Sequence, residues 1–321
     1  MRQVYLNGKF VPENEAKVSI YDSALMFGDM VFDMTRSFNK KQFKLKQHIQ
    51  RLYDSAKMVH INIPITQNEM EQLCYETIEK NESEFLETDE HRIFLNVSRG
   101  PLSIYSNIFD GKIEPTIIIA DFPLKWTVQG MGKMFDSGVN AVIPSQRAIP
   151  AHLMDPKIKN RSRLFYQLAN IEVSQFKGDN NWALLLDPDG FITEATGANF
   201  FIIKNEIIYT PEGRNILRGI SRDYIFELAE QLEMKCVEKN IEKYDVVTAD
   251  EAFMTGTPFS MLPVTQIEGM DIGNGKRGKN FDMILEKWSK NVGVNIENQI
   301  KKFNEETSDG KIGSTPYKFT K

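Results

Sequence analysis

The sequence predicts an α/β (α+β) protein built from two domains. Its 321 residues are enough for two separate cores, and strand-like and helix-like segments alternate along residues 1–122. This pattern breaks at residues 123–138, which contain one proline and three glycines: Pro123, Gly130, Gly132 and Gly138. We therefore expect an N-terminal α/β domain at 1–122, a connection at 123–138 and a C-terminal domain at 139–321.

The first domain is expected to contain a β-hairpin, two longer strands and a loop. Asn7-Gly8 separates two short apolar segments, and this dipeptide is typical of a two-residue hairpin turn. Residues 92–98 and 115–121 are rich in strand-forming side chains. A loop at residues 100–111 should join these two strands.

Two amphipathic helices are predicted in the same domain. Thr66 and Glu69 match a capping box, so a helix should begin there and run to about Lys80. The other helix covers residues 48–59, in which apolar side chains recur on one face: Ile49, Leu52 and Ala56.

The second domain is predicted to alternate hairpins and helices. Turns are expected at residues 187–190 and 204–205. A helix should start near Ser221, and another should run from Phe281 to about Glu306, before a loose polar tail at 307–321. The first of these helices should bury Ile225, Leu228, Ala229 and Leu232. Strands are expected at residues 139–143, 183–186, 191–194, 199–203, 207–210 and 248–255.

Composition argues against several classes of partner. A net charge of −5 without a dense Lys/Arg block gives no general attraction to nucleic acid or to an anionic membrane. No apolar run approaches the roughly 18 residues that a membrane span needs. Cys74 and Cys236 match no metal or redox spacing, so we expect free thiols in a reducing cytoplasm. The four histidines show no ligand spacing, so we expect no metal and assign them surface or capping roles.

Two segments are candidates for binding a phosphate group. In residues 217–221 a glycine, Gly219, directly precedes a predicted helix, whose first N–H groups could bind an anion. Thr255-Gly256-Thr257 ends a predicted strand and is a second candidate. No GxSxG, HExxH, Walker or GxGxxG motif occurs, which argues against hydrolase, zinc protease and dinucleotide-binding functions.

A wider pattern connects these candidates with other segments of the chain. In order, these segments are residues 5–11, 27–32, 48–56, 158–160, 193–200, 216–222, 249–257 and 263–264. Together they resemble, in the family's own order, the class IV, fold-type IV aminotransferases that depend on pyridoxal phosphate. This family includes branched-chain and D-amino acid aminotransferases, (R)-amine transaminases and aminodeoxychorismate lyase. The resemblance implies a smaller N-terminal α/β domain and a larger C-terminal domain with a mixed sheet or barrel.

The resemblance also implies roles for single residues. Lys159 matches the lysine that carries the cofactor as a Schiff base, a role that requires an amine. Glu194 matches the carboxylate that keeps the pyridine nitrogen protonated, and Arg51 matches the arginine that binds the phosphate. The remaining cofactor contacts implied are Leu217 against the ring and Gly219, Ile220, Ser221 and Thr257 around the phosphate.

The substrate motifs of the family are incomplete here. Branched-chain enzymes carry Tyr-x-Arg where this chain has Phe94-Leu95-Asn96. D-amino acid enzymes follow Arg-Gly with an arginine and a histidine, whereas Ile104 and Ser106 stand there in this chain. The candidate substrate-binding residues are Phe32, Arg36, Phe94, Asn96 and Pro258, in a pocket with an apolar lining to which Phe27, Met34 and Phe259 would also contribute.

The family tyrosine that supports the cofactor's O3′ in branched-chain enzymes, five residues after the lysine, corresponds to Leu164. Tyr166 lies nearby in sequence, but its helical phase argues against a simple replacement. Residues 162–164 are more similar to the lyase or D-amino acid branches, whereas the C-terminal helix and Thr-Gly-Thr are more similar to branched-chain enzymes.

We therefore expect ping-pong transamination between an amino acid, branched-chain or otherwise apolar, and a 2-oxo acid. A D-amino acid or (R)-amine transaminase and an aminodeoxychorismate-type lyase are the alternatives on the same fold. A cofactor-binding protein without catalysis and a sugar- or nucleotide-phosphate module are weaker ones. Family members are homodimers in which a partner loop completes the active site, and this loop corresponds to residues 100–111.

Overall fold

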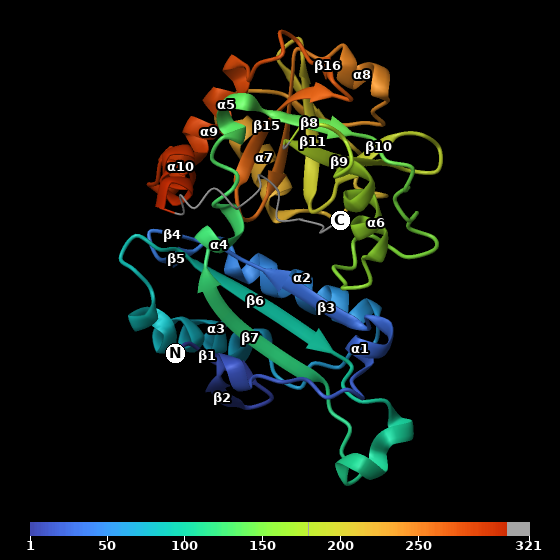
Figure 1. The fold of residues 1–321 in the computed structure, drawn as a ribbon, viewed down its shortest axis with the longest axis vertical. Helices are drawn as coiled ribbons and strands as arrows, with labels where there is room; N and C mark the ends of the chain where they lie inside the picture. The colour runs from blue at the N-terminus through green and yellow to red at the C-terminus, as the bar shows by residue number, and fades with distance from the viewer. Residues whose placement is uncertain (179, 307–321) are drawn as a thin grey trace. The chain divides into compact units, whose positions relative to one another are not determined.

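The computed structural model describes residues 1–178 and 180–306 and divides into two compact units (Figure 1). Unit 1 comprises Met1–Leu124 together with Ile158–Arg163, and unit 2 contains the rest of the chain. The segment Ile158–Arg163 therefore belongs to unit 1, although the residues on both sides of it belong to unit 2. The tail predicted at 307–321 lies outside the described residues.

Unit 1 is built on a five-stranded antiparallel sheet. The predicted hairpin is confirmed, and its turn residues Asn7 and Gly8 have φ angles of 47° and 90°, as a primed turn requires. The strands predicted at 92–98 and 115–121 are confirmed within one to two residues. In spatial order the sheet contains β2 (Lys9–Pro12), β1 (Gln3–Leu6), β7 (Thr116–Pro123), β6 (His91–Ser98) and β3 (Met30–Met34), so β3 is an edge strand.

Two helices, α2 (Leu45–Met58) and α3 (Gln67–Asn81), pack against this sheet (Figure 1). Both predicted helices are thus confirmed, and both hydrogen bonds of the capping box formed by Thr66 and Glu69 are present. The buried face of α2 and the sheet share one apolar core, which includes Ile49, Leu52, Ala56, Ile93, Leu95 and Ile119.

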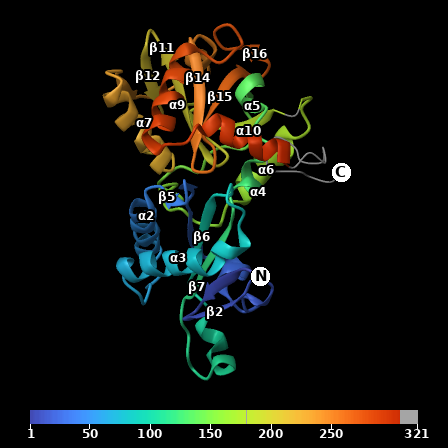
Figure 2. The same ribbon diagram turned by 90° about the vertical axis from the view of Figure 1, so that its left-hand side faces the viewer.

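Shorter elements complete unit 1. The predicted loop at 100–111 contains a 3-10 helix, η3 (Ser103–Phe109), which extends beyond the ends of β6 and β7 as the teal turn at the bottom of Figures 1 and 2. Its Tyr105 ring lies 4.7 Å from that of Tyr21. The other short elements of unit 1 are η1 (Glu13–Glu15), α1 (Ser23–Phe27), the hairpin of β4 (Ser37–Phe38) and β5 (Lys41–Gln42), and η2 (Glu82–Glu84).

Unit 2 is built on a mixed sheet that closes into a barrel, as predicted for the C-terminal domain. Closure comes from the pairing of β10 with β11, and β8 runs parallel to both of its neighbours. In order around the barrel the strands are β8 (Val139–Val142), β9 (Asn181–Leu186), β10 (Ile192–Ala195), β11 (Ala198–Lys204), β14 (Glu251–Gly256) and β15 (Ser260–Ile267). Outside it, β12 (Ile207–Thr210) and β13 (Cys236–Glu238) extend from β11, and β16 (Met270–Asp271) pairs with β15.

Helices cover the outside of the barrel. Figure 2 shows α7 (Ile220–Gln231) and α9 (Lys279–Val292) beside β14, and the rings of Tyr224 and Trp288 pack 4.9 Å apart between these helices. Leu232 lies at the end of α7 and is half-buried, so its predicted burial is only partly correct. The remaining helices are α4 (Lys125–Val128), α5 (Met134–Ser137), α6 (Leu164–Val173), α8 (Lys243–Val247) and α10 (Ile296–Glu306).

Two local predictions for this unit are wrong. The single helix expected at 281–306 is divided into α9 and α10, because Gly293 takes a left-handed φ of 70° and its N–H bonds to Lys290. The turn expected at 204–205 lies one residue later, where Asn205 and Glu206 both have positive φ angles. Within the described residues, no helix has the length and apolar character needed to cross a bilayer.

Candidate active site

Lys159 lies on a segment that pairs with the edge strand of unit 1. The N–H of Phe32 donates to the Lys159 carbonyl at 2.9 Å, and the N–H of Arg161 donates to the Met30 carbonyl at 2.9 Å. The N–H of Lys159 donates to the Ser55 hydroxyl on α2 at 3.1 Å. Backbone hydrogen bonds on both sides of Lys159 therefore fix its Cα against β3.

Aromatic and cationic side chains surround the lysine amine. Its Nζ lies 4.8 Å from the centroid of the Phe32 ring, and the Arg161 guanidinium lies 3.6 Å from the same centroid. Arg161 also lies 4.8 Å from the Phe94 ring and donates two hydrogen bonds to the Asn96 side-chain oxygen. The structure thus brings together three of the predicted substrate residues around an arginine that the sequence did not single out.

Arg51 on α2 is oriented by a buried carboxylate. Its Nε and Nη2 donate to the two oxygens of Asp33 at 2.8 and 2.9 Å, and the His48 ring lies 2.7 Å from the same group. Burial alone would raise the pKa of Asp33, but Arg51 and His48 outweigh it and hold that pKa below its usual range. Asp33 is therefore an anion that fixes the direction of the Arg51 guanidinium.

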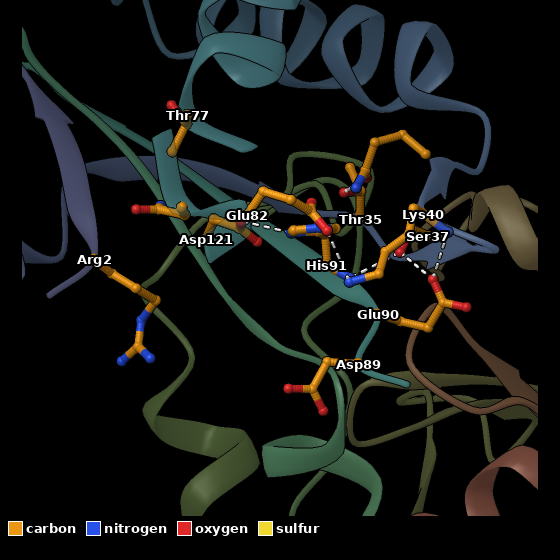
Figure 3. Close-up of polar contacts among 12 residues, drawn as sticks. Arg2, Thr35, Ser37, Lys40, Thr77, Glu82, Asp89, Glu90, His91 and Asp121 are labelled. Carbon is orange, nitrogen blue, oxygen red and sulfur yellow. Dashed lines mark hydrogen bonds and ion pairs between the residues drawn. The ribbon is translucent and has the colours of Figure 1, made fainter. Parts of the chain in front are cut away.

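The assignment of all histidines to surface or capping positions is wrong for His48 and His91, which are buried. Figure 3 shows His91 beside Glu82 and Asp121, whose oxygens lie 2.7 Å from its two ring nitrogens. A carboxyl group beside each ring nitrogen favours the imidazolium form of His91, in which both nitrogens donate. Burial alone would lower the pKa of His91, but the two carboxylates raise it above the ordinary value.

The structure places Arg36 in the interior of unit 1. Its guanidinium lies 3.7 Å from the Phe38 ring, and its Nε donates to the Ser37 carbonyl at 3.2 Å. Burial lowers the pKa of Arg36 to about 9, despite the nearby charge of Glu90. The nearby Ser37 hydroxyl donates to Glu90 (Figure 3). Arg36 therefore contacts neighbouring residues of unit 1. Its role in substrate binding stays a prediction.

In unit 2, Glu194 is a buried carboxylate that accepts from three neutral donors. Asn199, its cross-strand partner on β11, donates from Nδ2 at 3.1 Å, and the N–H of Leu217 donates to the same oxygen at 3.1 Å. The hydroxyl of Tyr166 donates to the other oxygen at 2.7 Å. Leu164 is exposed while Tyr166 faces inward, so the tyrosine makes a contact that its helical phase did not predict.

The N-terminus of α7 supplies a site for an anion in the same unit. Gly219 is the N-cap, and among the described residues no side-chain cap hydrogen bond is made at this helix start, whose first N–H groups are those of Ile220 and Ser221. A Cβ on Gly219 would come 2.1 Å from the Asn199 side-chain oxygen, so a larger residue there would have to displace the Asn199 side chain. Thr257 lies half-buried in the turn after β14.

The other predicted pocket residues fall in different environments. Phe27 on α1 is exposed, whereas Phe259 is buried against Trp182 at 5.9 Å in the barrel. Pro258 is half-buried in the turn between β14 and β15, and Met34 is half-buried at the end of β3. A role in lining a substrate pocket stays a prediction for all four.

These groups fit pyridoxal phosphate by their chemistry. Unit 1 presents the amine of Lys159 and the guanidinium of Arg51, which suit an aldehyde and a phosphate. Unit 2 presents the carboxylate of Glu194, which suits a protonated pyridine nitrogen, and an uncapped helix N-terminus, which suits a phosphate. Across residues 1–178 and 180–306, no cluster of His, Cys, Asp and Glu could hold a metal ion.

Comparison with known proteins decides what this set of groups does. A family model described as "Amino-transferase class IV" matches residues 30–267. The chain belongs to the class IV aminotransferases. The fold-type IV architecture is confirmed, and the protein is a transaminase that uses pyridoxal 5′-phosphate as its cofactor.

Individual members of the family are similar along most of their length. A "Putative branched-chain-amino-acid aminotransferase" of Methanocaldococcus jannaschii is 37% identical over 287 residues, covering 89% of this chain and 95% of the relative. A "D-alanine aminotransferase" of Bacillus licheniformis is 29% identical, covering 93% of this chain and 97% of the relative. The solved branched-chain aminotransferase of Thermoproteus uzoniensis with norvaline has a TM-score of 0.78 and 27% identity, covering 91% of this chain and 95% of that one.

Proposed function

We propose that this class IV aminotransferase moves the amino group of a branched-chain or other apolar amino acid to a 2-oxo acid. The observation that carries the proposal is the aromatic wall beside Lys159, formed by the rings of Phe32 and Phe94 on the neighbouring strands β3 and β6. Aromatic rings offer apolar contact area to an aliphatic side chain. The relatives named as branched-chain enzymes support the same substrate class.

The proposed roles follow from the contacts of each residue. Lys159 binds the cofactor carbonyl and, once released, moves the proton of the substrate Cα. Glu194 pairs with the pyridine nitrogen, so that the bound cofactor can withdraw electrons from that carbon. Phosphate binding is assigned to the guanidinium of Arg51, the N–H groups of Ile220 and Ser221 beside Gly219, and the Thr257 hydroxyl, and Leu217 packs against the ring.

Replacing Lys159 by Ala tests the central role. The variant should lose multiple-turnover transamination from leucine to 2-oxoglutarate, because alanine has no amine to bind the cofactor at the position that pairs with β3. Lys157→Ala is the matched control, since Lys157 lies two residues away and pairs with Asp155 at 2.8 Å. Sustained turnover by Lys159→Ala, or equal loss in both variants, would contradict the assignment.

The donor class is tested by spectroscopy of the wild-type enzyme. Separate samples receive L-leucine, D-alanine or (R)-1-phenylethylamine, and the visible absorption of the bound cofactor is followed. We expect L-leucine to change the spectrum most rapidly. A faster response to D-alanine would place the enzyme with the D-amino acid branch, and a faster response to the amine would place it with the (R)-amine branch. A spectrum that ignores all three donors would favour the lyase.

We also propose a cytoplasmic homodimer. Large apolar side chains are exposed on α1 and on η3, including Leu25, Phe27 and Ile104 at 68%, 68% and 75%, and a second copy would cover them. The two cysteines are free, which suits a reducing compartment. Light scattering should give twice the chain mass of 36.9 kDa, and a monomer at assay concentrations would contradict the dimer.

A further inference from the structure

We propose that Arg161 and Asn96 bind the carboxylate of the amino donor. This inference rests on the proposed function, since it assumes that the donor is an amino acid. It adds a residue pair that fixes the substrate class, because an amine without a carboxylate could not use these contacts.

The first observation is a half-buried cation without an anion beside it. The side-chain contacts of Arg161 among the described residues are the Asn96 oxygen and the rings of Phe32 and Phe94, with no Asp or Glu. Burial, and then repulsion from Arg163, lowers the pKa of Arg161 to about 10, so it is still charged at neutral pH. Buried charges are normally paired, so the site is complete only with an anion.

The second observation is an unpartnered donor beside that cation. Asn96 is 2% exposed, and its oxygen accepts from Arg161 at 3.0 and 3.1 Å. This fixes the orientation of the amide, because a flipped amide would set its NH2 against the guanidinium. The Nδ2 atom then points elsewhere and has no hydrogen-bond partner in the described part of the chain. Arg161 and Asn96 thus offer donors only, which a carboxylate, an acceptor-only group, satisfies.

The third observation is the position of this pair beside the reacting amine. Arg161 follows Lys159 by two residues, and the guanidinium carbon and the lysine Nζ lie 3.6 and 4.8 Å from the same Phe32 ring centroid. In an amino acid the carboxylate is bonded to the carbon that carries the amino group. An anion site this close to Lys159 therefore matches the substrate carboxylate rather than the cofactor phosphate, to which other groups are assigned.

The wild-type holoenzyme provides a test that needs no substitution. 4-Methylpentanoate and its neutral isostere 4-methylpentanamide are titrated separately, and binding is measured by calorimetry. Hydrogen bonds to charged groups predict that the carboxylate binds about 10- to 100-fold more tightly. Equal affinities would overturn the proposal, even if leucine is transaminated. Failure of every amino donor would instead refute the proposed function, so the two failures are distinguishable.

Variants then assign the preference to residues. Arg161→Gln should weaken 4-methylpentanoate binding about 10- to 100-fold and leave the amide unchanged, and it should raise KM for leucine more than it lowers kcat. Arg163→Gln is the matched control, because Arg163 lies over the same ring at 5.5 Å but donates to the Asn160 carbonyl. Loss of the preference in Arg163→Gln alone would overturn the assignment.

Asn96→Asp separates binding from a structural role and covers the case in which Arg161→Gln fails to fold. The new carboxylate would pair with the guanidinium and occupy the site, so the enzyme should stay folded and lose its preference for the carboxylate ligand. Unchanged binding of 4-methylpentanoate by a folded Asn96→Asp variant would show that Arg161 serves packing alone.

Discussion

Replacing Asp33 by Asn should destabilise the protein far more than its small change in shape suggests. Asp33 is fully buried and accepts two hydrogen bonds from Arg51, whose side chain is 13% exposed, and one from His48. Asparagine has nearly the same volume as aspartate but carries no charge. Its NH2 group would face either the Arg51 guanidinium or the His48 imidazole. The variant therefore removes the carboxylate that Arg51 faces with two of its guanidinium nitrogens.

Removing one partner of a buried ion pair costs about 3–5 kcal/mol, and we expect a loss of this size in the free energy of unfolding. Denaturant unfolding at pH 7 measures it. The pKa of Asp33 is depressed in the folded protein, so its stabilisation is present above the unfolded pKa of about 3.9 and is lost as the pH falls toward the folded value. The difference between the variant and the wild type should accordingly shrink in acid.

The control is Glu13→Gln, which breaks a pair of the same geometry at the surface. Arg2 donates to both oxygens of Glu13, whose side chain is 38% exposed, and the expected loss is about 0–1 kcal/mol. Cofactor binding gives a second readout: Asp33→Asn should weaken binding of pyridoxal phosphate but not of pyridoxal, which lacks the phosphate proposed for Arg51. A stability loss below that of Glu13→Gln would refute the reasoning.

Two further predictions concern buried polar groups. Tyr166→Phe removes a donor to Glu194 without leaving a cavity and should lower the free energy of unfolding by about 1.5–3 kcal/mol in chemical denaturation; no loss would mean that the hydroxyl is unbonded. The pKa of His91 is raised by Asp121 and Glu82, so its stabilisation is present below the unfolded pKa of about 6.5 and is lost as the pH rises through the folded value. His91→Gln should therefore cost more stability at pH 6 than at pH 9, and equal costs would contradict the imidazolium.

Local signals in the sequence predicted the local structure well. Asn7-Gly8 and the pair of Thr66 and Glu69 define a turn and a helix start through contacts within a few residues, and both are confirmed. A mixed sheet or barrel in the C-terminal domain was expected only from the family resemblance, and the pairing of β10 with β11 that closes the barrel was not predicted. Gly293 was missed as a helix end because the apolar pattern continues beyond it.

The residues of the candidate active site also fall into two groups, those that the sequence predicted and those that it did not. Lys159 and Glu194 lie in recognisable segments, and the structure shows how their surroundings hold them. Asp33 and Arg161 gave no local signal, and the helical phase of Tyr166 argued against it, because each acts through a partner far away in the sequence: Arg51, Asn96 and Glu194 respectively. A polar side chain in such a place resembles an ordinary surface residue until the fold brings the two together.

The pairing of residues 158–161 with β3 has a consequence for biosynthesis. During translation β3 is made more than a hundred residues before Lys159, and until then its outer edge is open to pairing with other chains. A fragment ending at Leu124 would keep that open edge and would lack the lysine, so unit 1 cannot be produced as one continuous piece. Nascent chains stalled before residue 158 should therefore be the form most prone to aggregate.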